Sequence, residues 1–342
     1  MRPEEIQAAI DRCPRRRMLH LPTPLQPLDR LQEVVGGPRV WVKRDDLTGL
    51  AFGGNKSRYL EFTLAEAIEQ GADAVVLSAV VHSNHCRQFA AAAARLGLEA
   101  VVVLRQSDTP MGLTDPVTGN YLLHHLFGAR VRVAPPEEVG PMIEEEMERF
   151  RRRGRTPFTG VSAVLSRVAY VQCALELAAQ CDAAGVEPAE VFVGSGGNSL
   201  AGLVAGFRLL RRQTPFIGTP QSHVADAGSA AGSVVARASE TIERLGLACD
   251  PMPAADGIRV DDRWVGPGFG ILDGPTREAI GLLARTEGLL VDPTYTGKAF
   301  TGLLAELRGG RWAEDADIVF VHTGGTPLVF TYGESLLEKS PA

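Results

Sequence analysis

Lys56 is the first candidate for chemistry, because it follows two glycines and an asparagine at the start of a segment with helical periodicity. A lysine is poorly suited to a helix N-terminus, where the helix dipole is positive. The same field, together with partial burial, favours a neutral and nucleophilic amine. Lysine is also scarce here, since only four of the 35 basic residues are lysines. Lys56 is therefore a candidate nucleophile, with a surface lysine beside a turn as the alternative.

A second candidate segment, Ser83-Asn84-His85-Cys86-Arg87-Gln88, follows an apolar run at 74–81. Serine and asparagine are good helix N-caps, so this segment could be structural only. Serine, asparagine, histidine and arginine together exceed what a cap needs. The residues alone leave both interpretations open, a structural helix cap and a functional segment.

The third segment is rich in glycine and lies between an apolar run and a helical pattern. Its members are Gly194, Ser195, Gly196, Gly197 and Asn198. Backbone N–H groups at such a helix N-terminus form an anion-binding nest. No Gly-Lys-Ser/Thr follows, and the spacing is not GxGxxG, so the usual nucleotide loops are excluded. The segment favours a phosphate cradle, with a tight turn as the alternative.

Two C-terminal segments add hydroxyl groups: 292–298 (DPTYTGK) and 322–327 (HTGGTP), the second after an apolar run. Each alone is compatible with an ordinary turn. The four segments together supply one amine, one phosphate cradle, several hydroxyls and no metal ligands. That set fits a phosphorylated aldehyde cofactor bound as an imine.

The elements that must position these segments alternate between strands and helices from Pro38 onward. Strands are expected at Arg39–Lys43, Ala74–Leu77, Ala100–Leu104, Arg130–Val133, Glu190–Val193, Phe216–Gly218 and Asp317–His322. Helices are expected at Ser57–Gln70, His85–Leu96, Tyr121–Leu126, Met142–Arg153, Tyr170–Ala184, Ser199–Arg212, Thr276–Glu287 and Gly297–Gly309. The stretch 225–232 is expected to be a loop or helix cap, and 249–264 an irregular connection.

This alternation predicts the α/β class, with parallel sheets covered by helices on both faces. A length of 342 residues indicates two such domains, with the site in the cleft between them. Each candidate segment lies where a strand or loop meets a helix, which is where open α/β sheets bind their ligands.

The composition excludes several classes of protein. A formal net charge of −6 argues against a nucleic-acid binder, whose surface would be basic. Five cysteines without a CxxC pair form neither a disulfide framework nor a zinc site, and they suit a reducing cytoplasm. No apolar stretch approaches the ~20 residues of a membrane helix, and no signal-peptide core is present. A cytoplasmic protein with no metal and no membrane or nucleic-acid partner is expected.

The chain resembles the pyridoxal-phosphate enzymes of the tryptophan-synthase β fold (fold-type II), specifically the D-cysteine desulfhydrase/1-aminocyclopropane-1-carboxylate deaminase family. The matching segments include GGNKSR, SNHCRQ, GSGG, EGLLVDPTYTGKA and VFVHTGGTP, in the family's order over about 21–332. The resemblance implies a large cofactor-binding domain of residues 1–59 and 168–342, a small domain of residues 60–167, and a homodimer.

The resemblance also assigns roles toward pyridoxal 5'-phosphate. Lys56 is expected to bind the cofactor aldehyde and then act as the base at the substrate Cα. Asn84 is expected to bond the cofactor's ring oxygen, and the 194–198 loop to hold the phosphate. Thr323, or Thr296, is expected at the pyridine nitrogen, where a neutral hydroxyl favours elimination over transamination.

Ser83, His85, Phe269 and Tyr295 are expected to face a small amino-acid substrate, with Ser83 and Tyr295 also catalytic. Thr296 replaces the glutamate that the deaminase branch carries after its tyrosine, which favours the desulfhydrase side.

Other residues depart from the pattern of this family. Tyr59 replaces a lysine that usually reaches toward the phosphate, and Phe269 replaces a second active-site tyrosine. His82 replaces a glutamine, GSGGNSLAGL is one residue longer than usual, and TGVSAVLSR lacks the usual GGS.

The expected reaction is α,β-elimination on a small amino acid, giving a 2-oxo acid and ammonia. D-Cysteine is the default substrate, and L-cysteate, β-chloroalanine and the cyclopropane amino acid are alternatives. The alternative enzyme is a β-replacement synthase. The alternative that is not an enzyme is a non-catalytic cofactor-binding homologue, which the replacements at Tyr59 and Phe269 suggest.

Overall fold

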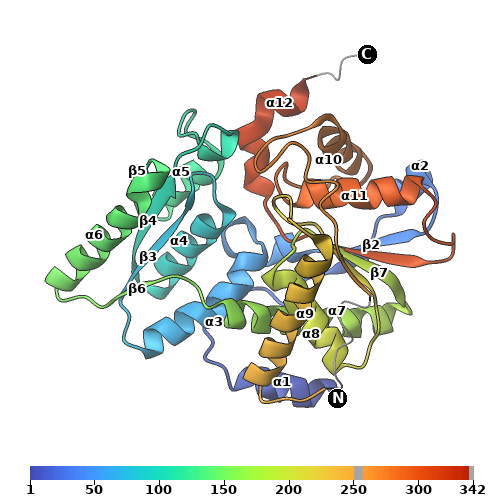
Figure 1. Cartoon of the computed structure of the whole chain (residues 1–342), viewed down its shortest axis with the longest axis horizontal. Helices are drawn as coiled ribbons and strands as arrows, with labels where there is room; N and C mark the ends of the chain where they lie inside the picture. Colours follow the sequence, from blue (N-terminus) through green and yellow to red (C-terminus); the bar gives the residue numbers. More distant parts are fainter. Residues whose placement is uncertain (250–256, 339–342) are drawn as a thin grey trace.

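Two sheets organise the chain, and the computed structural model describes residues 1–249 and 257–338 of it (Figure 1). The six-stranded sheet has the order β1-β2-β10-β7-β8-β9 and the four-stranded sheet the order β5-β4-β3-β6. The strands are β1 Leu25–Pro27, β2 Arg39–Lys43, β3 Ala74–Val80, β4 Glu99–Arg105, β5 Arg130–Ala134, β6 Pro157–Thr159, β7 Pro188–Val193, β8 Phe216–Gly218, β9 Ile258–Val260 and β10 Asp317–Val321.

Neighbouring strands are parallel except for β1, which runs antiparallel to β2 at the edge of the larger sheet. The α/β class with two sheets is therefore confirmed, and the larger sheet is mixed rather than purely parallel. An antiparallel edge strand needs only a short connection, here the helix α2 between β1 and β2.

Helices cover both faces of both sheets, as unalternated apolar strands require. Their bounds are α1 Pro3–Asp11, α2 Asp29–Val35, α3 Asn55–Glu69, α4 Asn84–Leu96, α5 Gly119–Leu126, α6 Val139–Arg152, α7 Ala163–Ala184, α8 Asn198–Leu209, α9 Ala227–Arg244, α10 Gly274–Glu287, α11 Thr296–Arg308 and α12 Gly333–Leu337. Short 3-10 helices are η1 Asp45–Leu47, η2 Leu50–Phe52, η3 Pro110–Gly112, η4 Pro136–Glu138 and η5 Thr326–Tyr332.

Strand β10 shows how one strand serves two cores. Ile318 and Phe320 pack with α2, α10 and α11, whereas Val319 and Val321 pack with α1 and α7–α9 on the other face. The smaller sheet is likewise packed between α3 and α4 on one face and α6 on the other. Both faces of each strand are buried because side chains alternate along it.

Some expectations about the elements are wrong. The stretch 225–232, expected as a loop or helix cap, does hold the N-cap of α9, because Asp226 accepts from the backbone N–H of Ser229, but residues 227–232 are already the first turns of the helix. The connection at 249–264 contains the strand β9, and residues 250–256 of it lie outside the described residues. Helix α7 begins seven residues before the expected Tyr170, at the Ser162 N-cap.

The expected domain division has a simple relation to these elements. Strands β3–β6 lie within residues 60–167, and the strands of the larger sheet lie outside that range. The chain crosses between the two sheets through α3 and α7, so both expected boundaries fall inside helices. The domain boundaries themselves stay a prediction.

None of the helices in the described residues is long and apolar enough to cross a membrane.

Candidate functional site

Two glycine-rich loops meet at the start of α3. Gly53 and Gly54 have φ of 63° and 124°, and a Cβ on Gly54 would lie 2.8 Å from the Gln88 side chain. On the other loop, a Cβ on Gly324 would lie 2.6 Å from the Cα of Gly54. The backbone N–H of Asn55 donates to the carbonyl of Thr323 at 3.0 Å. The two loops therefore approach backbone to backbone, which only glycine allows.

The side chain of Lys56 is half-buried between two aromatic rings. Its Nζ lies 5.9 Å from the ring centroid of Tyr59 and 6.0 Å from that of Tyr295. No hydrogen bond or ion pair of this amine occurs among the described residues. Burial lowers the pKa of Lys56 to about 8, with Asp292 opposing the shift and Arg87 adding to it. At pH 7 roughly a tenth of the amine is therefore neutral, far more than for a lysine with the ordinary pKa.

Ser83 caps α4 and also faces the site. Its Oγ accepts from the backbone N–H groups of His85 and Cys86, each at 3.1 Å. The hydroxyl hydrogen of Ser83 stays available as a donor. Beside it, the Nε2 of His85 is buried without a hydrogen-bond partner. Burial and the nearby Lys56 lower the pKa of His85 to about 3, so its imidazole is neutral.

Asn84 is locked as a hydrogen-bond donor toward the site. Its Oδ1 accepts from Nη1 of Arg87 at 2.8 Å and from Nδ2 of Asn120 at 2.9 Å. With both acceptor positions occupied, the amide nitrogen is left to donate. Arg87 itself is fully buried, and its other contacts are Asn120 Oδ1 and the carbonyl of Gly53. Burial lowers the pKa of Arg87 to about 9 against the attraction of Asp292.

The loop from Gly194 to Asn198 joins the end of β7 to the start of α8. Its residues are half-buried, and the Oγ of Ser195 accepts from the N–H of Gly197 at 3.2 Å. The Oδ1 of Asn198 accepts from Arg167 at 3.4 Å, so its backbone N–H and its Nδ2 are the donors left for the loop. The first N–H groups of α8 have no acceptor within the helix. The loop is therefore an open anion nest.

Tyr59 and Ser199 join this loop to α3. The Tyr59 hydroxyl and the Ser199 hydroxyl share a short hydrogen bond, and Asn55 donates to Ser199 at 3.0 Å. Burial raises the pKa of Tyr59. The phenol at the position of the usual lysine thus bonds α8 rather than standing free in the cradle.

Tyr295 precedes α11 and is positioned by Asp292. Oδ1 of Asp292 accepts from the N–H of Tyr295 at 2.8 Å, and its Oδ2 accepts from Thr296. The Tyr295 ring packs edge-on against Phe269, with centroids 5.9 Å apart. Burial and Asp292 raise the pKa of Tyr295, so its phenol stays protonated. No hydrogen bond to its hydroxyl occurs in the described part of the chain.

The structure distinguishes the two threonines that were expected at the pyridine nitrogen. Thr296 is fully buried, and its hydroxyl donates to Asp292 at 2.6 Å. The Thr323 hydroxyl makes no hydrogen bond to any described residue, whereas its carbonyl accepts from Asn55. Thr323 is therefore the one with a free hydroxyl.

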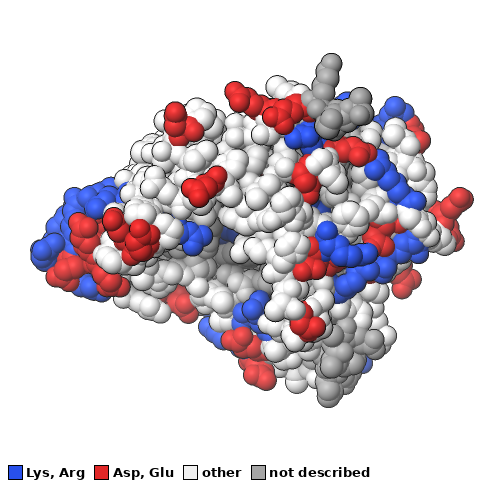
Figure 2. All heavy atoms as spheres, turned by 45° about the horizontal axis from the view of Figure 1, so that its top comes forward, with Lys and Arg blue, Asp and Glu red and all other residues white. Residues whose placement is uncertain are grey.

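A cavity of about 660 Å³ opens beside these groups between the two sheets. Ser83, Phe269 and Tyr295 line it, together with residues at the ends of β3 and β4. Figure 2 shows the surface hollowed between the lobe that carries the four-stranded sheet and the rest of the molecule, with basic side chains near the margin. The site thus draws on both sheets.

Three residues that lie within the candidate segments take roles that the sequence did not assign to them. Asp292 orients Tyr295, and Arg87 orients Asn84. Lys298 donates to the carbonyls of Val265 and Gly268, the latter at 2.7 Å, and so holds the loop that carries Phe269. The Asp-Pro before the tyrosine was a visible N-terminal helix signal. The partners of Arg87 and Lys298 are distant in sequence, so no local signal identified them.

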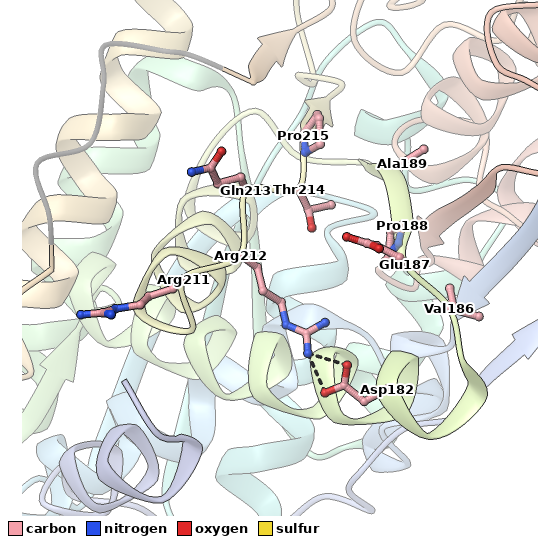
Figure 3. Close-up of a pocket in the computed structure, with 10 residues that line it drawn as sticks. All are labelled: Asp182, Val186, Glu187, Pro188, Ala189, Arg211, Arg212, Gln213, Thr214 and Pro215. Atoms are coloured by element: carbon pink, nitrogen blue, oxygen red, sulfur yellow. Dashed lines mark hydrogen bonds and ion pairs between the residues drawn. The ribbon is translucent and has the colours of Figure 1, made fainter.

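Another hollow, of about 680 Å³, lies where β7 begins, at the opposite end of that strand (Figure 3). Its charged lining includes Arg212, which pairs with Asp182 at 2.6 Å. None of the amine, nest or hydroxyl groups described above lines it. The chemistry-bearing residues therefore gather at the carboxyl end of β7.

The groups present fit pyridoxal 5'-phosphate. The half-buried amine of Lys56 fits its aldehyde, and the open nest at Gly194–Asn198 fits its phosphate. The amide donor of Asn84 fits its ring oxygen, and the free hydroxyl of Thr323 fits its ring nitrogen. The unpartnered Nε2 of His85 is an independent sign that a polar ligand belongs here, because buried polar atoms are nearly always bonded. No group of three or more His, Cys, Asp or Glu in the described residues is arranged to hold a metal ion.

Comparison with known proteins agrees with this fit. The family described as "Pyridoxal-phosphate dependent enzyme" matches residues 17–324. A D-cysteine desulfhydrase of Yersinia enterocolitica is 39% identical over 335 residues, covering 96% of this chain and 98% of that protein.

Solved structures give the same result. A structure described as an ACC deaminase homologue is 33% identical, with a TM-score of 0.83, covering 98% of this chain and 99% of the other. A threonine deaminase of T.th. is 22% identical with a TM-score of 0.62, covering 99% of each chain, and shows likeness of fold alone.

Proposed function

This chain belongs to the family of pyridoxal-phosphate dependent enzymes, and we propose that it is a lyase acting on a small amino acid. It removes the Cα proton, expels a substituent from Cβ and yields a 2-oxo acid and ammonia. When bound, pyridoxal phosphate supplies the electron sink that makes the Cα proton acidic. The name of the Yersinia relative makes D-cysteine the first substrate to test.

Each residue has one task in this proposal. Lys56 holds the cofactor and then carries the Cα proton, which its lowered pKa allows near neutral pH. The nest at Gly194–Asn198 and the donor of Asn84 orient the cofactor. Ser83, His85, Phe269 and Tyr295 contact the substrate, and the Tyr295 phenol stays protonated to bond it.

The single observation that carries the proposal is the state of Lys56. An amine with a pKa of about 8 stands between two aromatic rings, without a hydrogen bond or ion pair in the described residues. A lysine kept for structure would be paired or solvated. Thr296, bonded to Asp292, stands where the deaminase branch has glutamate, so elimination is favoured over ring opening.

The test is a substrate screen with Lys56→Ala as the matched variant. Small D- and L-amino acids (cysteine, cysteate, β-chloroalanine and 1-aminocyclopropane-1-carboxylate) are assayed for 2-oxo acid and ammonia. The wild type is expected to turn over at least one, and the variant to lose at least about 10³-fold in kcat/KM. Full activity in the variant, or no cofactor absorbance in the wild type, contradicts the proposal. Added thiol that appears in a new amino acid indicates β-replacement instead.

A homodimer and a cytoplasmic location are part of the same proposal. The homodimer rests on the resemblance and the location on cysteine usage. Four of the five cysteines, Cys13, Cys86, Cys173 and Cys181, are buried thiols outside any disulfide. Sedimentation at assay concentration tests the dimer.

A further inference from the structure

Arg87 differs from the other buried arginines in its partners. The arginines that are buried among the described residues are Arg58, Arg87 and Arg167, with 2%, 0% and 3% of their surface exposed. Arg58 pairs with the carboxylate of Glu176, and Arg167 pairs with that of Glu240. Arg87 forms no ion pair within the described part of the chain, although buried charges are nearly always paired. Its charge therefore has no counter-ion in contact with it.

The hydrogen bonds of Arg87 all go to neutral oxygen atoms. Its Nη1 donates to the Oδ1 of Asn84 at 2.8 Å and to the Oδ1 of Asn120 at 2.9 Å. Its Nη2 donates to the carbonyl of Gly53 at 2.8 Å, and its Nε is buried without a partner. These contacts fix the position of the guanidinium but leave its full charge in place.

The titratable groups around Arg87 leave the local charge positive. Burial lowers the pKa of Arg87 to about 9, so the guanidinium is protonated near neutral pH, and Asp292 attracts it without forming an ion pair. On α3, burial and the charge of Arg87 both lower the pKa of Lys56. His85 on α4 and His124 on α5 are neutral, because burial lowers the pKa of each to about 3. These surroundings favour an anion nearby.

Asn84 is the member of this network that faces the proposed cofactor site. Its Oδ1 accepts from both Arg87 and Asn120, so its amide nitrogen donates in the other direction. A guanidinium on the amide oxygen polarises the amide and strengthens the donation from its nitrogen. The ring oxygen of pyridoxal phosphate, which fits this donor, is a phenol oxygen that is negative when ionised. The charge of Arg87 and this anion thus lie on opposite sides of one amide.

We propose that Arg87 is a positioning residue whose uncompensated charge, relayed by the amide of Asn84, keeps the ring oxygen of the bound cofactor ionised. This proposal rests on the placement of the ring oxygen at Asn84 in the proposed function and deepens it, and it holds for any amino-acid substrate. Asn120 serves the same role, since it holds the side chains of Arg87 and Asn84 together.

The experiment is a pH titration of the visible absorbance of the bound cofactor, in the holoenzyme without substrate. Arg87→Gln keeps N–H donors but removes the charge. Its midpoint is expected to rise by at least about one pH unit, because loss of a nearby positive charge favours the protonated cofactor. Arg87→Lys keeps the charge and is expected to stay within about half a unit of the wild type. The control is Arg95→Gln, which removes an exposed charge in the last turn of α4 and is expected to shift nothing.

A second pair of variants leaves Arg87 in place and decides the test if Arg87→Gln does not fold. Asn120→Asp puts a carboxylate against the guanidinium, whereas Asn120→Ala removes the same amide and adds no charge. Relative to the Ala variant, the Asp variant is expected to raise the midpoint by at least about one unit. It is also expected to bind the cofactor about 10-fold more weakly in a fluorescence titration.

The outcomes separate this proposal from the proposed function. Equal midpoints in Arg87→Gln and Arg87→Lys, or in the two Asn120 variants, overturn it, because the shape of the side chain and not its charge would then matter. The expected shifts support it even if no amino acid is turned over, an outcome that defeats only the proposed lyase. Turnover by a wild type whose variants show no such shifts defeats only the role of Arg87.

Discussion

Lys56 and Arg58 are two cations two residues apart on α3, and their surroundings are opposite. Arg58 is buried, and its guanidinium bonds both oxygens of Asp45 at 2.8 Å and both oxygens of Glu176 at 2.8 and 2.9 Å. Although burial opposes it, these carboxylates raise the pKa of Arg58. Lys56 has no such partner among the described residues, and burial lowers its pKa to about 8.

The difference separates a cation kept for structure from one kept for reaction. Arg58 anchors the start of α3 to α7 and to the strand β2 region, since Glu176 lies on α7 and also pairs with the buried Lys43. The pKa of Asp45 falls to about 2, because Arg58 outweighs the effect of burial. The paired network holds the helix rigid, and the unpaired amine is thereby positioned without being neutralised by an ion pair.

Loss of Arg58 is expected to have the largest effect on stability. Arg58→Ala leaves Asp45 and Glu176 buried without their main partner, so the free energy of unfolding should fall by about 3–5 kcal/mol. Urea unfolding of the cofactor-free protein measures it. The matched control is Lys56→Met, which removes the other cation of α3 and should change stability by about 1 kcal/mol or less. Equal losses of stability in both variants would contradict the structural role of Arg58 and the reactive role of Lys56.

The pH dependence of stability sharpens the same comparison. In the cofactor-free protein, folded Lys56 releases its proton at about pH 8, whereas the unfolded lysine holds it until about 10.5. The unfolded state thus binds more protons between these values, and the free energy of unfolding should rise with pH across that window. The measurement is the difference between wild type and Lys56→Met at pH 7.5 and pH 10, which cancels other titrating groups. A difference that stays flat contradicts the lowered pKa.

The two threonines offer a similar contrast between a bonded and a free group. Thr323→Val removes the free hydroxyl and is expected to lower kcat about 10-fold and shift the absorbance of the bound cofactor. Thr296→Val removes the bond to Asp292 and is expected to cost about 1–3 kcal/mol of stability with a smaller change in absorbance. Visible spectra and urea unfolding of both variants test this. The opposite pattern would assign the ring nitrogen to Thr296.

Tyr59→Phe is expected to have the smallest effect. Its hydroxyl bonds Ser199 and Asn55 within the protein, so its loss should cost about 1 kcal/mol of stability. Cofactor affinity, measured by fluorescence titration, should change less than about threefold. A larger loss of affinity would mean that the phenol serves the phosphate as the usual lysine does.

Much of the fold followed from local patterns. The apolar runs of β2, β3, β4, β7 and β10 and the helices after them were identified because burial on both faces leaves a continuous hydrophobic signal. The three-residue strands β1, β6 and β9 were missed, because so few residues carry little pattern, whereas the equally short β8 was predicted. The cap of α9 was among the expectations for 225–232, but its first helical turns were not recognised because they consist of Gly, Ala and Ser.

The candidate site divides in the same way. By itself the sequence determined the residue types: a lysine after two glycines, a nest, and hydroxyls at the ends of strands. Only the tertiary structure decided which of them are free and which are bonded. Thr323 and Thr296 are alike in local sequence signal, and so are Lys56 and Arg58. Thr296 is bonded to Asp292, four residues away, and Arg58 to Glu176, which packing brings near from far along the chain. Local sequence does not encode a contact such as that between Arg58 and Glu176, because packing depends on residues far apart along the chain.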